Sequence, residues 1–170
     1  MRALPPPPRA VTAALDLLIG RCAFWFAVAA LGVALLVVWA QVFARYVLND
    51  SLVWAEELTR FALAWSTMVG AAAAYRLGEH IGVTMVIERL RGRWRALVIR
   101  AVHLLVLAFA LLLAWEGWLF ALRNFARGQL TAAMQVPIAW AHLAVPVGAA
   151  LIAIAAAEAL WRGTPPTKGS

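Results

Sequence analysis

The sequence predicts an all-α integral membrane protein with four transmembrane helices, short amphipathic connecting helices and both termini in the cytoplasm. Hydrophobic residues make up 65% of the 170 residues, charged residues only 14%, and the mean hydropathy is +0.83. A soluble domain carries about a quarter charged residues, and one of this size could not bury so much apolar surface in its core. A bilayer removes that constraint, because lipid solvates the outer faces of the helices.

The first predicted helix covers residues 17–46. Within it, residues 22–44 carry no charge over 23 residues, which is longer than the apolar region of about 7–15 residues in a signal peptide. At about 1.5 Å per residue this run extends about 34 Å, enough to cross the hydrocarbon core. We therefore expect a retained transmembrane helix. The preceding residues 1–16 are expected to form a flexible tail, because Pro5 to Pro8 oppose a helix.

Three further transmembrane helices complete the predicted domain, which covers residues 17–161. The second is expected over residues 52–76, although its fully apolar part, residues 61–75, is only 15 residues long. The third is expected over residues 97–122, and the fourth runs from Pro137, which suits a first helical turn, to Trp161. A short amphipathic helix is expected over residues 83–90, and residues 162–170 form a C-terminal tail.

Basic residues indicate the orientation of these helices. With the N-terminus inside, eleven of the 15 lysines and arginines lie on the cytoplasmic side. The four on the outer side are Arg45, Arg60, Arg123 and Arg127. The positive-inside rule therefore places both termini in the cytoplasm. The net charge of +7 does not indicate a nucleic-acid partner, because the basic residues flank apolar segments and form no basic face interleaved with aromatic residues.

The second helix carries small residues at every fourth position. These residues are Ala62, Ser66, Gly70, Ala74 and Gly78. Such a ridge lets another helix approach closely enough for van der Waals contact along the backbone. An alanine-rich chain also produces this spacing by chance, and the pattern leaves open whether the ridge packs within the chain or onto a partner.

A charged group opens the same helix. Glu56 and Arg60 are four residues apart and Glu57 is three residues from Arg60, so both acids can reach the arginine. An ordinary solvated helix start has the same pattern, since the helix dipole favours acids near the N-terminus. The spacing alone is consistent with both interpretations.

No arrangement of catalytic or metal-binding residues is found in the sequence. Cys22 is the only cysteine, so no internal disulfide is possible. His103 and His142 fall near opposite membrane surfaces and cannot share one haem iron, while His80 lies on the inner side. Glu116 falls near the outer interface, where it should extend toward water or pair with Arg45, Arg60 or Arg123 instead of relaying protons. We expect a chain that is not an enzyme and holds no cofactor or metal.

Two motifs lie in the middle of the chain. Their residues are Arg45, Tyr46, Val47, Asn49, Ser51, Trp54, Glu56, Glu57, Leu58 and Arg60, followed after the small-residue helix by Arg76, Gly78, His80 and Ile81. This order and spacing resemble the small, DctQ-like membrane subunit of tripartite ATP-independent periplasmic (TRAP) transporters. The family pattern reads approximately RYVFN-x-S-x-x-W-x-EEL-x-R and then R-x-G-x-HI. The resemblance covers residues 15–161, includes a loose match at residues 131–137, and departs from the pattern at Leu48, where the family often has phenylalanine.

The resemblance implies a function that the composition cannot show. In such transporters a small subunit works with a large multi-span membrane subunit and a periplasmic substrate-binding protein. Transport is secondary, usually sodium-driven, and carries organic acids. This chain would then be a multi-pass protein of the bacterial inner membrane that supports the large subunit, which would bind the sodium, and helps dock the binding protein. The residues expected to face a partner or lipids are Arg45, Tyr46, Asn49, Trp54, Glu56, Glu57, Arg60, Arg76 and His80.

Two alternatives from other classes stay open at this point. One is a membrane anchor of a respiratory complex, with or without haem, and a Soret band in the purified protein would reveal the haem. The other is a self-contained small transporter, which would take up solute without any partner. His80 and His103, both on the inner side, are the histidines that could bind such a haem, although capping and hydrogen bonding at the interface explain them equally simply.

Overall fold

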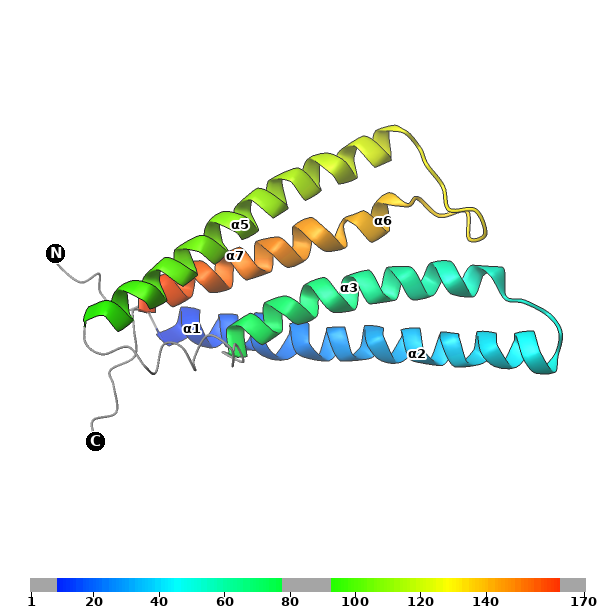
Figure 1. Ribbon diagram of the computed structural model, residues 1–170, viewed down its shortest axis with the longest axis horizontal. Coiled ribbons are helices and arrows are strands. Elements are labelled where there is room, and N and C mark those ends of the chain that lie inside the picture. Colours follow the sequence, from blue (N-terminus) through cyan, green and yellow to red (C-terminus); the bar gives the residue numbers. More distant parts are fainter. Residues whose placement is uncertain (1–8, 78–92, 163–170) are drawn as a thin grey trace.

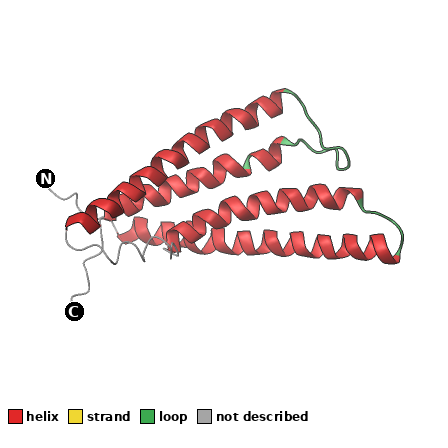
Figure 2. Cartoon of the chain, viewed as in Figure 1, coloured by secondary structure: helices red, strands yellow, loops and turns green. Residues whose placement is uncertain are grey.

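The computed structural model describes residues 9–77 and 93–162 (Figure 1). One continuous helix comprises α1 (Arg9–Leu15), a π-helical segment η1 (Asp16–Cys22) and α2 (Ala23–Val47). It is followed by α3 (Val53–Leu77), α5 (Arg93–Ala126), α6 (Ala139–His142) and α7 (Ala144–Arg162). Within the described ranges, residues 48–52 and 127–138 connect the helices (green in Figure 2), and the only strand-like pairing is an isolated bridge between Leu130 and Pro137. The predicted all-helical class is confirmed.

The long helices lie side by side in one layer. α2 packs on α3, α3 packs on α7, and α7 packs on α5, so the last helix of the chain lies between the second and third (Figure 1). We call the end where α1 begins and α7 finishes the terminal end. The opposite end, which carries residues 48–52 and 127–138, is the loop end. α2 and α5 form the two edges of the layer and diverge toward the loop end.

Three described segments are long and apolar enough to cross a membrane. They are Thr12–Val47, Trp94–Ala126 and Ala139–Trp161. α3 is not among them, and its uninterrupted apolar run is limited to residues 61–75 between Arg60 and Arg76. The least apolar of the long helices therefore occupies the middle of the layer, between α2 and α7.

Several boundaries differ from those expected. The first helix begins at Arg9, so residues 9–16 are helical where a flexible tail was predicted. The third runs over Arg93–Ala126, beyond residues 97–122 at both ends. The fourth begins at Ala139 and is interrupted at Leu143, because Pro146 has no N–H to donate to the carbonyl of His142. Gly78, His80, the predicted helix at 83–90 and residues 163–170 lie outside the described residues.

Asn49 ends the first long helix. It adopts a left-handed conformation with φ of 52°, and the N–H of Asp50 donates to the carbonyl of Ala44 at 3.1 Å. This bond satisfies a carbonyl of the last helical turn, and the left-handed residue before it is a position where asparagine can replace the usual glycine. Asn49 and Asp50 therefore close α2 before α3 begins.

Small residues fill the interior of the layer, and large apolar side chains cover its outside. Most buried apolar residues are alanines, whereas Leu36 and Leu105 are more than 70% exposed. Gly148 of α7 approaches α3 so closely that an added Cβ would lie 2.7 Å from the carbonyl oxygen of Met68. This distribution suits helices that associate in lipid, where backbone approach contributes more than apolar burial.

The predicted small-residue ridge faces α2 at its centre. The hydroxyl of Ser66 donates to the carbonyl of Ala27 at 2.9 Å, and a Cβ added to Gly70 would lie 3.4 Å from the Cβ of Ala27. Ala74 lines the same shallow groove between α2 and α3, and Ala62 is half-buried on α3. The structure therefore places the middle of this ridge against a neighbouring helix of its own chain.

Candidate functional site

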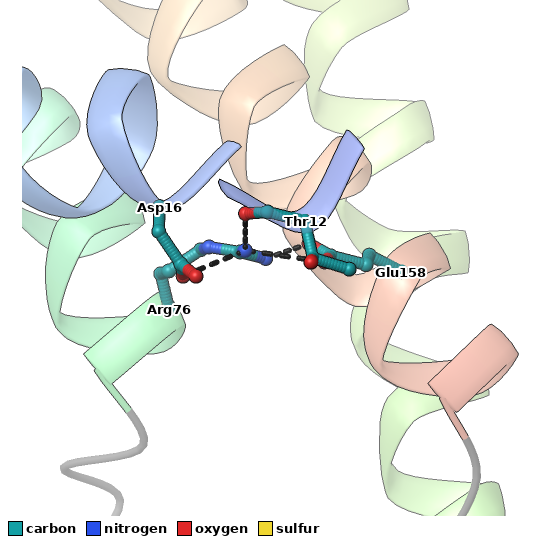
Figure 3. Close-up of polar contacts among 4 residues, drawn as sticks. All are labelled: Thr12, Asp16, Arg76 and Glu158. Carbon is teal, nitrogen blue, oxygen red and sulfur yellow. Dashed lines mark hydrogen bonds and ion pairs between the residues drawn. The ribbon is translucent and has the colours of Figure 1, made fainter. Parts of the chain in front are cut away.

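A buried cation links three segments at the terminal end. Arg76, near the end of α3, donates to the Oδ1 of Asp16 at 2.8 Å and to the Oε1 of Glu158 at 3.1 Å. A second guanidinium nitrogen forms an ion pair with the other carboxylate oxygen of Glu158. Arg76 also donates to the backbone carbonyl of Thr12 at 3.2 Å. Figure 3 shows Arg76 between the N-terminal helix and α7.

Two of the three charged side chains in this cluster are almost fully buried. The side chains of Arg76 and Glu158 are only 6% and 4% exposed, whereas that of Asp16 is 63% exposed. A buried guanidinium needs both opposite charge and hydrogen-bond acceptors, because it does not lose its proton. Arg76 was expected to face a partner or lipid. The structure corrects this expectation, because its side chain is bonded inside its own chain.

A second polar contact lies at the same end. The hydroxyl of Tyr75 and the Nδ1 of His103 are 2.6 Å apart, and the two rings meet edge to face. Tyr75 is buried against Ala155 and Ala156 of α7. This contact joins α3 to α5 across α7 and satisfies a tyrosine hydroxyl in an apolar layer.

At the loop end, Glu57 holds the connection between α5 and α6. Its two carboxylate oxygens accept hydrogen bonds from the backbone N–H groups of Ala133 at 2.9 Å and Met134 at 2.8 Å. These bonds lower the pKa of the Glu57 carboxyl, which lies outside the apolar run 61–75. Residues 129–138 form a narrow turn in which the N–H of Thr131 donates to the carbonyl of Val136 at 2.8 Å. We call residues 129–138 the hairpin.

The other predicted interface residues of α3 and α2 lie at the surface of the loop end. Arg60 pairs with Glu56 at 2.5 Å, and both side chains are well exposed. Arg45 and Tyr46, at the end of α2, and Trp54, at the start of α3, are also exposed. The structure brings Glu56 and Arg60 together as their spacing allows, whereas Glu57 bonds to the hairpin.

A polar groove also opens at the loop end, between α5 and the start of the last helix. It is lined by Glu116, Gly117, Phe120, Arg123, His142 and Val145. The rings of Phe120 and His142 meet edge to face, with centroids 4.7 Å apart. Glu116 takes no part in the ion pairs of the described residues, which join Arg60 to Glu56 and Arg76 to Asp16 and Glu158. An acid within the apolar part of a membrane span is costly unless it is paired or hydrated, so Glu116 requires a partner or water.

Sequence reasoning missed Asp16, Glu158 and the hairpin. Asp16 and Glu158 could have been predicted to pair with a basic residue. Each is an acid in a largely apolar helix near the terminal end, and burial of such an acid requires a cation. The contact between Glu57 and the hairpin joins residues more than 70 positions apart through backbone N–H groups, which carry no sequence signature. His103 and His142 lie toward opposite ends of the layer, as their spacing predicted.

The sequence matches a known family over most of its length. The family described as "Tripartite ATP-independent periplasmic transporters, DctQ component" matches residues 34–165. This range includes most of α2 and all of α3, α5, α6 and α7. It therefore covers Glu57, Arg76, Glu116 and Glu158, but not Asp16.

Individual relatives agree with this match. The chain is 36% identical over 91 residues to the C4-dicarboxylate TRAP transporter small permease protein DctQ of Vibrio cholerae, covering 52% of this chain and 39% of the relative. It is 27% identical over 108 residues to the sialic acid TRAP transporter small permease protein SiaQ of the same organism, covering 64% and 61%. A C4-dicarboxylate DctQ of Rhodobacter capsulatus is 29% identical over 102 residues, covering 60% and 45%. The matches thus span less than two thirds of each relative's own length.

The buried pair yields the first prediction. Glu158→Leu should lower the free energy of unfolding by about 3–5 kcal/mol, because it leaves the Arg76 charge buried without its main partner. Replacing both residues, as in Arg76→Met with Glu158→Leu, should cost less than the sum of the two single changes. Unfolding of the purified protein in detergent measures these differences. Glu56→Gln, in an exposed pair, is the control and should cost at most about 1 kcal/mol; an equal loss in Glu158→Leu and Glu56→Gln would contradict this prediction.

The second prediction concerns the hairpin. Glu57→Ala removes the acceptor of two backbone N–H groups, so amide hydrogen exchange at Ala133 and Met134 should become several-fold faster. Because the folded pKa lies below the ordinary value of 4.5, the protection is present at neutral pH. It should disappear as the pH falls below 4.5 through the folded pKa. Exchange measured by mass spectrometry on residues 129–138 tests both statements, with Glu56→Ala as the control; unchanged exchange in Glu57→Ala would refute them.

Proposed function

Because the chain belongs to the DctQ component family of TRAP transporters, we propose that it is the small scaffold subunit of such a transporter. In this proposal it supports a large multi-span subunit in the cation-coupled uptake of an organic acid. The observation that carries the proposal is the family match over residues 34–165, which includes the whole of three long helices. The relatives named for C4-dicarboxylates and sialic acid suggest a carboxylate substrate.

We further propose that α3 is a fourth membrane span. Its 25 residues extend about 37 Å at the usual helical rise, enough for the hydrocarbon core. Glu57 and Arg76 flank the apolar run 61–75, outside its two ends, and both are bonded to other segments of the chain, so neither charge has to enter the hydrocarbon without a partner. Four spans in an inner membrane put both termini on one side, and the basic residues favour the cytoplasm for the terminal end.

The structure also supports the assignment of transport to a partner. Between the two ends of the layer, the described buried residues are small and apolar, including Val69 of α3 and Ala144 and Ala149 of α7. Most described polar contacts between helices lie toward the two ends; the exceptions at the middle of α3 are the hydroxyl of Ser66, bonded to Ala27, and the indole N–H of Trp65, bonded to the carbonyl of Trp140. Transporters instead form their substrate and ion sites near the midplane, from interrupted helices. In this proposal the large subunit binds substrate and sodium, and the loop end faces the periplasmic binding protein.

Membrane topology gives the third prediction. A cysteine added after Ser170 in a Cys22→Ala background should react with a membrane-impermeant maleimide only after the inner membrane is permeabilised. A cysteine at Gln135 in the exposed hairpin should react in intact spheroplasts. Labelling of the C-terminal cysteine in intact spheroplasts would overturn the four-span arrangement.

Uptake by a reconstituted system gives the fourth prediction and tests the function itself. Proteoliposomes that hold this chain and the large subunit, supplied with the binding protein and a sodium gradient, should accumulate a labelled C4-dicarboxylate or sialic acid. Liposomes with this chain alone should accumulate neither, because the residues that the structure describes form no polar site at the midplane. Omitting this chain should abolish uptake. Accumulation by this chain alone, or full uptake without it, would reject the scaffold proposal.

Uptake by whole-system variants adds a control for the role of the loop end. Glu57→Ala or Arg60→Ala should lower the transport rate while leaving the preference between two competing organic acids unchanged. A changed preference would show that these residues contact the substrate.

A further inference from the structure

Three polar side chains without an observed partner line one groove at the loop end. Glu116 and Arg123 of α5 and His142 of α6 share it with Phe120 and Val145. Neither Glu116 nor Arg123 takes part in the ion pairs of the described residues. The Nδ1 of His142 is buried and has no hydrogen-bond partner among those residues. The groove therefore holds an acid, a cation and a ring nitrogen that this part of the chain leaves unsatisfied.

The depth of Glu116 makes lipid tails an unfavourable neighbour for it. Glu116 stands ten residues before the end of α5 at Ala126, which is about 15 Å along the helix axis. α5 is an edge of the layer, and only 6% of its apolar segment is buried within the chain. Lipid tails offer no hydrogen bond to a carboxylate, and ionisable residues in membrane spans generally face protein or a water-filled cavity. A further protein surface on this side of α5 would supply the hydrogen bonds that lipid tails do not.

We propose that this groove docks a transmembrane helix of the large subunit, with a basic or hydrogen-bond-donating side chain at the depth of Glu116. The proposal rests on the scaffold function proposed above. The order of the charges along α5, with the acid deeper than the cation, favours a helix over a phospholipid as the occupant. Glu116 lies about 10 Å deeper than Arg123, so a phosphate at Arg123 would place its ammonium group away from Glu116. A helix can present a cation at the inner position and an acid or carbonyl at the outer one.

The contacts expected of this helix follow from the groove. Its donor meets the Glu116 carboxylate, and an acceptor or acid meets the exposed guanidinium of Arg123. A polar group reaches the Nδ1 of His142, whose ring is held edge to face by Phe120. Three satisfied polar groups at fixed depths would set the vertical register of the two subunits as well as join them.

Photo-cross-linking tests the location directly and is the fifth prediction. A p-benzoyl-phenylalanine replacing Phe120 in the groove should cross-link to the tagged large subunit when the two are expressed together. The same group replacing Phe43, which is exposed on α2 at the opposite edge of the layer, is the comparison and should give a lower yield. Cross-links from position 120 to lipid alone, or none in an intact complex, would overturn the proposal.

Charge reversal tests the chemistry. Glu116→Lys should reduce the large subunit recovered with this chain about tenfold, equivalent to about 1.4 kcal/mol, with a smaller reduction for Glu116→Gln. Asp50→Lys reverses an exposed acid of the loop end outside the groove and should leave recovery unchanged. Circular dichroism of each purified variant shows whether it folds. The cross-linking experiment at position 120 does not depend on these variants, because Glu116 is unchanged in it.

The outcomes separate the two proposals. If the unaltered chain recovers the large subunit but Glu116→Lys does so equally well, the groove proposal fails and the scaffold function stands. If the unaltered chain does not recover the large subunit at all, both fail. Loss of recovery in Glu116→Lys but not in Asp50→Lys, together with the cross-link from position 120, supports both.

Discussion

The burial of Arg76 constrains the order of the helices. Because a buried cation needs opposite charge close by, the position of Arg76 fixes where acids must be. Glu158 approaches from α7 and Asp16 from the N-terminal helix, and both must reach the end of α3 at once. This requirement is met when α3 lies between α7 and the N-terminal helix, as it does in the layer. The chain order of the helices does not predict this arrangement, since α7 lies between α3 and α5.

The same constraint explains how the least apolar long helix is accommodated. α3 carries charged residues near both ends, and each end is bonded to another segment, through Arg76 at one end and Glu57 at the other. Its position in the middle of the layer shields it from lipid on two sides. The apolar helices α2 and α5 occupy the edges, where lipid contact is greatest. Apolar character thus increases from the middle of the layer to its edges.

Much of the fold was predictable because the length of a run of apolar residues decides whether a segment can cross a membrane. Apolar run lengths located all four long helices, and the motif from Arg45 to Arg60 indicated the family. The π-helical segment and the helical residues 9–15 were not predicted, because the proline run at Pro5 to Pro8 suggested a longer tail. The site was predicted only in part. The spacing of Glu56 and Arg60 identified a local pair, but the partners of Glu57 and Arg76 depend on which distant segments meet, and no local pattern encodes that.

Because of the π-helical segment from Asp16 to Cys22, the orientation of the N-terminal helix depends on the number of residues in this segment as well as on their identity. Each residue advances an α-helix by about 100° around its axis. Removing one residue from this segment would therefore rotate everything before it by about a quarter turn relative to α2. Thr12 and Asp16 would then point away from Arg76, although every side chain of the cluster would still be present. This stretch should accept many substitutions, yet an insertion or deletion of a single residue would leave the buried guanidinium without two of its acceptors.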